Sequence, residues 1–331
     1  MNGKRSICLL LAAAMLLLFS ACSSTEKELQ KVSEVGYYLD TVITLTAYTD
    51  NPDVLKDAMQ ECGRLEAILS RTEEGSDVWR INHANGEPVE VSEETAEVLA
   101  CALEIGKLSG GAFDITVAPV SVLWDFKSGK AVLPDPEAIT EAVKLVDYTK
   151  IRLDGRTVIL PAGMMIDLGG IAKGYIADKV KSYLEKRGVK HAILSFGGNI
   201  VAIGKKPDGS DWKVGIQDID RPTGEYMLVT RNTGGSTVTS GTYERGFDLD
   251  GVRYHHLLSP RTGWPVQNGL ASVTIISENS MRGDALATAA FVLGPEEGKA
   301  LIESQDGVEA VFIRKDRTLI YTSGADSYII Q

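Results

Sequence analysis

Two glycines followed by a lysine form the stretch of this chain best suited to bind a phosphate. Residues 164–178 start with an apolar run that predicts a buried strand, turn at Gly169 and Gly170, and become helix-like from Ala172. Glycines in such a turn let a ligand lie against bare backbone, and the N–H groups at the start of the next helix favour an anion. We therefore expect this loop, with Lys173, to bind phosphate. A tight strand–helix turn without any ligand would explain the glycines equally well.

An acidic side chain and a hydroxyl one helical turn apart suggest a metal site. If Asp284 opens a helix, the Thr288 hydroxyl lies on the same face. These two groups offer hard oxygens to Mg²⁺, which usually takes one or two protein carboxylates together with phosphate oxygens. The alternative is purely structural: Asp284 would favour the helix dipole, and Thr288 would bond back to the helix backbone.

Two further motifs carry polar groups that packing alone does not require. The segment 195–199, SFGGN, is a strand end that breaks into two glycines. It either faces the same cleft as Gly169 or is a plain exit from the strand. His255 and His256 precede a Pro turn. Because successive side chains of a strand point to opposite faces, only one of them can face a site while the other points outward. Histidine suits proton transfer near neutral pH, but an ordinary surface or core histidine is the alternative.

The N-terminus predicts export and a lipid anchor. Lys4 and Arg5 precede an apolar run that is too short to span a bilayer comfortably, and small residues lead to Cys22. This pattern resembles the lipobox of bacterial lipoproteins. We expect residues 1–21 to be a lipoprotein signal peptide, Cys22 to be lipidated, and residues 22–36 to be a polar tether. The protein would then work in the cell envelope, on the periplasmic side or the outer face of the plasma membrane. An ordinary secretory signal cut near residue 21 is the alternative.

Charge and cysteine content exclude several classes of protein. The chain has 331 residues and a formal charge of −11, which becomes −13 when the two cations of the leader are lost. An acidic surface argues against nucleic acid as a partner. Cys62 and Cys101 fall in apolar helical patterns, so a disulfide framework is not expected, although one bond between them stays open. No Cys/His cluster has the spacing of a zinc site.

The element pattern predicts an α+β fold, a single compact domain over residues 37–331 with helices packed on mixed, mainly antiparallel sheets. Residues 70–90 are expected to form a loop, and the glycine turn at 109–111 is expected to lead into a strand. The other strands are expected at 37–48, 151–153, 156–160, 192–196, 212–217, 226–230 and 271–277, with a hairpin at 250–251. Helices are expected after 51–52, over 92–108, after 134–136, from 172 and over 284–293.

Five motifs, taken in this order, resemble the ApbE-like flavin transferases. They are 167–175 (DLGGIAKGY), 195–199 (SFGGN), 239–245 (TSGTYER), 256–263 (HLLSPRTG) and 284–289 (DALATA). The resemblance covers residues 37–321 and implies an ApbE-like domain. It implies a transferase that uses Mg²⁺ to split FAD, attaches FMN through a phosphoester to a threonine of a partner protein, and releases AMP.

The resemblance also implies roles for particular residues. Asp284 and Thr288 would bind Mg²⁺ together with the backbone carbonyl of Gly170. The residues expected to bind FAD are Leu39, Thr72, Ala112, Phe113, Asp114 and Lys173. Thr72 stands where the family usually offers an aromatic ring, so the ring that stacks on FAD must come from elsewhere or be missing.

The catalytic roles and partners follow from the same resemblance. His256 matches the family histidine and is the candidate base or orienting group, with His255 as its outward neighbour, and Lys173 would neutralise phosphate charge. The implied acceptors are membrane redox subunits of Na⁺-pumping NADH:quinone reductase or Rnf type, or secreted flavoproteins. Two alternatives stay open. One is an FAD pyrophosphatase that gives FMN and AMP, and the other is a non-catalytic, lipid-anchored FAD-binding protein, which would need no metal.

Overall fold

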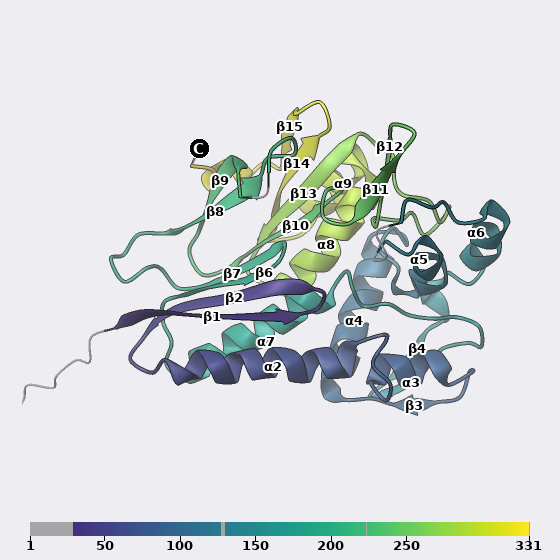
Figure 1. Cartoon of the computed structure of the whole chain (residues 1–331), viewed down its shortest axis with the longest axis horizontal. Helices are drawn as coiled ribbons and strands as arrows, with labels where there is room; N and C mark the ends of the chain where they lie inside the picture. The colour runs from purple at the N-terminus through teal and green to yellow at the C-terminus, as the bar shows by residue number, and fades with distance from the viewer. Residues whose placement is uncertain (1–28, 127–129, 223, 331) are drawn as a thin grey trace, which may run out of the picture.

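The computed structural model describes residues 29–126, 130–222 and 224–330 (Figure 1). The expected signal peptide and Cys22 lie outside these ranges. The predicted tether over 22–36 is too long, because strand β1 (Gln30–Tyr38) is already part of the domain. The domain therefore begins by residue 30 rather than 37. No helix in the described ranges is long and apolar enough to cross a lipid bilayer.

An eight-stranded sheet runs through the centre of the molecule. Its strand order is β1-β2-β6-β7-β10-β13-β14-β15, and neighbouring strands pair antiparallel. After β1, the strands are β2 (Thr41–Thr49), β6 (Ala192–Phe196), β7 (Asn199–Ile203), β10 (Ser236–Gly241), β13 (Leu270–Ser277), β14 (Glu309–Arg314) and β15 (Leu319–Tyr321). The sequence prediction of helices on a mainly antiparallel sheet is confirmed.

Helices pack against one face of this sheet. They are α2 (Asp53–Leu69), α7 (Ala172–Lys186), α8 (Ser280–Leu293) and α9 (Pro295–Glu303), while α4 (Glu93–Leu108) packs on α8. In Figure 1, α2 runs alongside the hairpin of β1 and β2, and α8 lies behind β10 and β13. The apolar stripe predicted for α2 is buried, from Leu55 to Leu69. Each such side chain removed from water contributes about 1.5–3 kcal/mol to folding.

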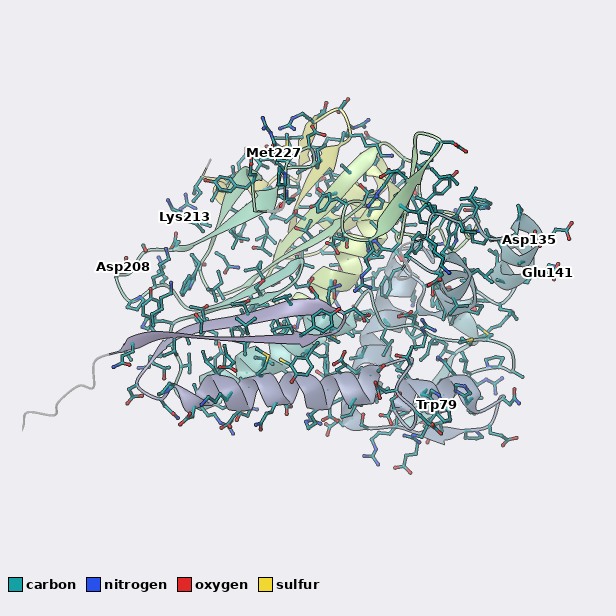
Figure 2. The ribbon with its side chains drawn as sticks, viewed as in Figure 1. Trp79, Asp135, Glu141, Asp208, Lys213 and Met227 are labelled. Atoms are coloured by element: carbon teal, nitrogen blue, oxygen red, sulfur yellow. The ribbon has the colours of Figure 1, made fainter. Side chains whose placement is uncertain are left out.

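A two-stranded hairpin, β8 (Trp212–Gln217) with β9 (Tyr226–Asn232), lies on the opposite face (Figure 2, where Lys213 and Met227 mark it). Ile216 and Leu228 of the hairpin pack on Val311 and Ile313 of β14. On β10, Val238 faces α8 through its contact with Gly283, so the neighbouring side chains Thr237 and Thr239 face the hairpin side. The sheet therefore has a helical face and a second face that is covered only in part.

A smaller group of elements closes one end of the sheet. It contains α3 (Asp77–His83), β3 (Val89–Glu90), α5 (Ala118–Trp124), α6 (Pro136–Val143), β4 (Arg152–Asp154), β5 (Thr157–Ile159), β11 (Gly246–Leu249) and β12 (Val252–His255). Trp124 anchors α5 by donating its indole N–H to the Gly263 carbonyl at 2.8 Å. Its ring packs on Phe126, Tyr254 and Trp264.

Three predictions of local structure were wrong. The strand predicted over 37–48 contains a turn at Leu39 and Asp40, both with φ of 56°. Polar and apolar residues alternate both before and after this two-residue turn, so the sequence pattern did not reveal the turn. The loop predicted over 70–90 contains α3, capped by Ser76, and β3. The strand predicted after the glycine turn at 109–111 is a 3₁₀ turn, Ile115–Val117, that leads into α5.

Two further corrections concern the site. Residues 164–168 are not in a sheet, although Met164, Ile166 and Leu168 are buried as in a strand. Helix α8 begins at Ser280, four residues before the predicted start, because Asn279 caps it. Cys62 and Cys101 are both buried free thiols, so the disulfide left open between them is absent.

Candidate active site

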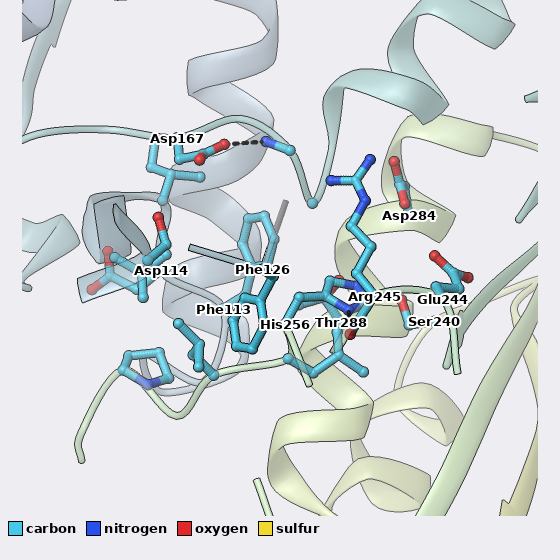
Figure 3. A pocket seen from close by; sticks show the side chains of 18 of the residues that line it. Phe113, Asp114, Phe126, Asp167, Ser240, Glu244, Arg245, His256, Asp284 and Thr288 are labelled. Carbon is cyan, nitrogen blue, oxygen red and sulfur yellow. Dashed lines mark hydrogen bonds between the residues drawn. The ribbon is translucent and has the colours of Figure 1, made fainter. Parts of the chain in front are cut away.

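A cavity of about 430 Å³ opens where α7, α8, β10 and the segment 112–126 meet (Figure 3). Sequence-predicted residues that are far apart in the chain line it together. They are Ala112, Phe113, Asp114, Gly170, Lys173, His256, Asp284 and Thr288. Leu39 and Thr72 are not among its lining residues, so their contact with FAD stays a prediction.

Helices α7 and α8 are clasped together at the wall of this cavity. The Gly174 N–H donates to Oδ2 of Asp284 at 2.9 Å. In the other direction, Asp178 accepts from the N–H groups of Ser280 and Met281, at 3.0 and 2.8 Å. A Cβ on Gly174 would lie 2.2 Å from the Ser280 carbonyl oxygen, so glycine is required for this close approach.

Asp284 does not cap its helix. It lies one turn inside α8, is 3% exposed, and leaves the capping role to Asn279, whose side chain accepts from the Arg282 N–H. The structural alternative for Asp284, an N-terminal charge on the helix dipole, is therefore wrong. Its carboxylate, held through Oδ2 by the Gly174 N–H, lines the cavity and can offer oxygens to a cation there.

The donor set around Asp284 fits Mg²⁺. Thr288 is one turn further along α8 and lies next to Gly170. A Cβ atom added to Gly170 would be 3.5 Å from Thr288 Oγ1. Ser240 Oγ is 3.4 Å from the same Thr288 oxygen. Carboxylate, hydroxyl and carbonyl oxygens are all hard ligands. No cluster of three His, Cys, Asp or Glu occurs among the described residues.

His256 lies in the cavity wall as a neutral imidazole. Its Nδ1 is 3.3 Å from the Arg245 carbonyl oxygen. Its position deep in the protein and the positive charge of Lys173 lower its pKa to about 3. A neutral ring can accept a hydrogen bond from an incoming hydroxyl group at physiological pH.

His255 is not the outward neighbour that strand alternation predicted. It is fully buried, its Nε2 is 3.0 Å from the Val266 carbonyl oxygen, and its ring meets the edge of Phe291. Burial lowers its pKa to about 4. His255 and His256 do point to opposite sides, but the side opposite the cavity is the protein core rather than solvent.

Sequence reasoning gave no role to Glu244, which also lines the cavity. The side chain is exposed in the cavity, where desolvation by the surrounding protein raises its pKa, an effect opposed by Lys173 and Arg245 and increased by Asp284. A Cβ on Gly198 would lie 2.8 Å from Glu244 Oε1, so the second glycine of the SFGGN motif makes room for this carboxylate. The only signal in the sequence was the TSGTYER motif, which does not itself indicate where the side chain points.

Two phenylalanines provide rings where Thr72 does not. Thr72 is exposed and pairs with Ser70 at 3.2 Å, while its neighbour Arg71 enters the cavity wall and pairs with Asp167 at 3.1 Å. Phe113 and Phe126 line the cavity, and Figure 3 shows their rings next to each other. An aromatic base or flavin ring could stack on either of them.

A second cavity of about 420 Å³ adjoins the first, on the sheet face that carries β8 and β9. The two share Lys173, Thr239, Glu244 and Arg245. The remaining lining residues are Asp40, Thr41, Gly197, Gly198, Ile200, Val214, Gly215, Gln217, Thr237 and Tyr243. Leu39 belongs to the adjoining turn, and its carbonyl oxygen is 3.5 Å from Nη2 of Arg245. Lys173 therefore stands where two compartments meet.

Comparison with known proteins identifies a single family. A family model described as the ApbE family matches residues 39–312. The FAD:protein FMN transferase of Klebsiella pneumoniae (strain 342) is 35% identical over 288 residues, which are 85% of this chain and 88% of that protein. The FAD:protein FMN transferase of Treponema pallidum (strain Nichols) is 35% identical over 317 residues, 89% of this chain and 88% of that protein.

Solved structures agree with the sequence matches. The ApbE protein of Thermotoga maritima superposes with a TM-score of 0.84 at 31% identity, covering 91% of this chain and 100% of its own. The flavin transferase ApbE of Vibrio cholerae superposes with a TM-score of 0.82 at 27% identity, covering 91% of this chain and 99% of that protein's chain.

Proposed function

The chain belongs to the ApbE family and is a transferase that moves FMN from FAD to a protein, and we propose that the reaction depends on Mg²⁺, joins FMN to an acceptor threonine through a phosphoester, and releases AMP. The observation that carries the proposal is the convergence of Gly170, Asp284 and Thr288 beside Lys173 in one cavity. These groups supply hard oxygens and a cation at one place, as cleavage of a pyrophosphate requires.

Asp284, Thr288 and the Gly170 carbonyl would hold the metal. When bound, Mg²⁺ would neutralise the charge that grows on the bridging oxygen as the pyrophosphate breaks. The Gly174 N–H supports this set by fixing Oδ2 of Asp284. Ligands held in position by such second contacts bind a metal more tightly.

The rest of the site binds and orients the substrates. Lys173 would neutralise phosphate oxygens at the junction of the two cavities. Phe113 and Phe126 would pack against a ring of FAD. Neutral His256 would orient the acceptor hydroxyl or take its proton. Because phosphoryl transfer has a loose transition state, positioning contributes more than a strong base.

The direct test is flavin labelling. The purified protein is incubated with FAD, Mg²⁺ and membranes of the source organism, and the products are separated on a denaturing gel. A fluorescent protein band together with released AMP supports the transferase. Free FMN and AMP without a band would identify an FAD pyrophosphatase. Intact FAD at every Mg²⁺ concentration would identify a non-catalytic carrier.

The site of action is a second part of the proposal. An apolar leader ending at Cys22, followed by polar residues, supports a lipid-anchored protein on the extracytoplasmic side of the membrane. Stable anchoring takes more than one acyl chain, which full lipoprotein processing supplies. Acceptors at that location would be flavin-carrying subunits of membrane redox complexes, of Na⁺-pumping NADH:quinone reductase or Rnf type, or secreted flavoproteins. Detergent partitioning of wild type and Cys22→Ala tests the anchor, since equal partitioning would reject it.

A further inference from the structure

Three large apolar side chains lie exposed together at the turn end of the β1–β2 hairpin. Val35 is 63% exposed, Tyr37 69% and Val42 56%. The strand register pairs Tyr37 directly with Val42 and Val35 with Thr44, so all three share one face of the hairpin. The opposite face is covered, since Gly36 and Tyr38 pack on α2.

The apolar character is confined to this end of the hairpin. Further from the turn, the same face carries Lys31, Ser33 and Thr46, and the last two share a hydrogen bond of 2.9 Å. At that far end Tyr48 is in contact with Trp212 of β8, with ring centroids 6.3 Å apart. The exposed group is therefore local, and exposed apolar groups of this kind commonly mark interaction sites.

The exposed face continues into the second cavity. The strand register aligns Val35 and Thr44 of this face with Ser195, Ile200 and Thr237. Ile200 and Thr237 line the second cavity, together with Asp40 and Thr41 at the hairpin turn. On the other side, Tyr226 is 54% exposed and packs over Gly215, which also lines the cavity. Apolar side chains thus stand on two sides of an opening that leads to Lys173 and Glu244.

We propose that the acceptor protein docks on this face, with Val35, Tyr37 and Val42 against an apolar surface that flanks its threonine. The proposal rests on the proposed function, because a transferase must bring a second protein within reach of the phosphate at Lys173. Aromatic side chains are enriched at protein interfaces and often dominate their binding energy. The second cavity then gives the threonine-bearing segment a route to the shared residues.

The arrangement favours a protein over a lipid surface. The N-terminal end of the described chain enters the hairpin at its polar end, through Gln30 and Lys31, and the apolar group lies at the far end, beside the cavity. A membrane-facing hairpin would be expected to carry its apolar residues at the anchored end. The three side chains are also few for a stable dimer, whose interface buries roughly 800 Å² on each subunit.

The test replaces the exposed side chains without weakening the strands. Tyr37→Thr/Val42→Thr places a β-branched residue, which favours strands, at both positions, and Val252→Thr changes a 41% exposed valine on β12 as the matched control. The rate of flavin labelling is measured against the amount of source membranes, beside the FAD dissociation constant and the melting temperature. We expect the half-saturating amount of membranes to rise about tenfold in the double variant, equivalent to about 1.4 kcal/mol. FAD affinity, melting temperature and the control variant should not change.

The other outcomes each overturn the proposal. Unchanged labelling would show that the acceptor docks elsewhere, and an equal loss in Val252→Thr would show a nonspecific effect. A weakened FAD affinity would assign the face to the nucleotide. Loss of sedimentation with phosphatidylethanolamine/phosphatidylglycerol vesicles would assign it to the membrane, and loss of a dimer in sedimentation velocity would assign it to a second copy. If wild type cleaves FAD but labels no protein, the proposed function itself is wrong, and the proposed docking site is rejected as well.

Discussion

The backbone N–H of Gly174 donates to the buried carboxylate of Asp284 at 2.9 Å. This bond joins the helix that begins at the proposed phosphate-binding loop to the helix that carries the proposed metal ligands. Asp178 completes the clasp by accepting from the first N–H groups of α8. Backbone contacts therefore hold the two helices together, and these contacts would set the spacing of the proposed phosphate and metal sites.

Gly174→Ala should disrupt these contacts. The new methyl would lie 2.2 Å from the Ser280 carbonyl oxygen, and overpacking of this kind costs about 1–3 kcal/mol. We expect a lower melting temperature together with a higher Mg²⁺ requirement for FAD cleavage. Thermal melts and Mg²⁺ titrations measure both effects. A variant that keeps both values would show that the helices can separate without affecting the site.

Lys173→Ala should weaken FAD binding more than it affects folding, because Lys173 lines both cavities. Lys179→Ala is a matched control on the same helix, since its ammonium group pairs with Glu97 at the surface, at 2.7 Å. Surface pairs contribute at most about 1 kcal/mol. FAD titration and melting temperature for the two variants separate the roles. If Lys173→Ala melts early but binds FAD normally, the lysine is structural.

His256→Asn should slow flavin transfer while FAD stays bound. Histidines that act as acid–base or orienting groups contribute roughly 10²–10⁴-fold to rate. Because the pKa of His256 is about 3, the ring is already neutral at pH 5, and its own titration should give no step in the rate between pH 5 and 8. A pH–rate profile for wild type and variant checks this. A wild-type step near pH 6.5 that His256→Asn removes would contradict the assignment.

The sequence predicted local elements well and distant contacts poorly. The stripe in α2, the hairpin at Asp250 and the helix after Gly170 follow from periodicity and turn residues, which are local properties. The start of α8 was missed because α8 begins with Ser280 and Met281, whose N–H groups are satisfied by Asp178 from a different helix.

The same difference between local and distant contacts applies to the residues of the candidate site. Asp284 and Thr288 were found because helical spacing places them on one face. Glu244 was missed, because it follows β10 and comes near Lys173 only when β10 packs on α8, which in turn packs on α7. The second cavity was missed for the same reason, since its lining combines the turn at Asp40 with glycines from β6–β8.

His255 should contribute a pH-dependent part of the stability. Its folded pKa of about 4 lies below the ordinary value of 6.5, so between these pH values the unfolded chain binds more protons. The unfolding free energy should therefore fall as pH decreases from 6.5 to 4, by about 3 kcal/mol from this group. His255→Gln can still donate to the Val266 carbonyl oxygen but does not titrate. Urea unfolding at pH 7.5, 5.5 and 4.5 should show its deficit relative to wild type shrinking as pH falls, and parallel curves would reject the assignment.

Asp284→Ala should abolish FAD cleavage at ordinary Mg²⁺ concentrations while the fold persists. The change removes the charged ligand and leaves the Thr288 hydroxyl and the Gly170 carbonyl, which hold Mg²⁺ poorly without phosphate. It also leaves the Gly174 N–H without its acceptor, so we expect a stability loss of about 1–3 kcal/mol. Asp284→Asn keeps an oxygen for both partners and should retain part of the activity, with further rescue by excess Mn²⁺. Thr288→Val should fall between these two, because it keeps the shape and loses one oxygen.

Activity as a function of Mg²⁺ concentration, measured beside melting temperature for the three variants, separates a metal ligand from a structural carboxylate. A structural role predicts activity that follows stability, with Asp284→Asn close to wild type at every Mg²⁺ concentration. A metal role predicts a raised Mg²⁺ requirement even where the variant is fully folded, as in Thr288→Val. Full activity of Asp284→Ala at limiting Mg²⁺ would remove the metal site, and with it the observation on which the proposed mechanism depends, because Lys173 alone would then have to neutralise the phosphate charge.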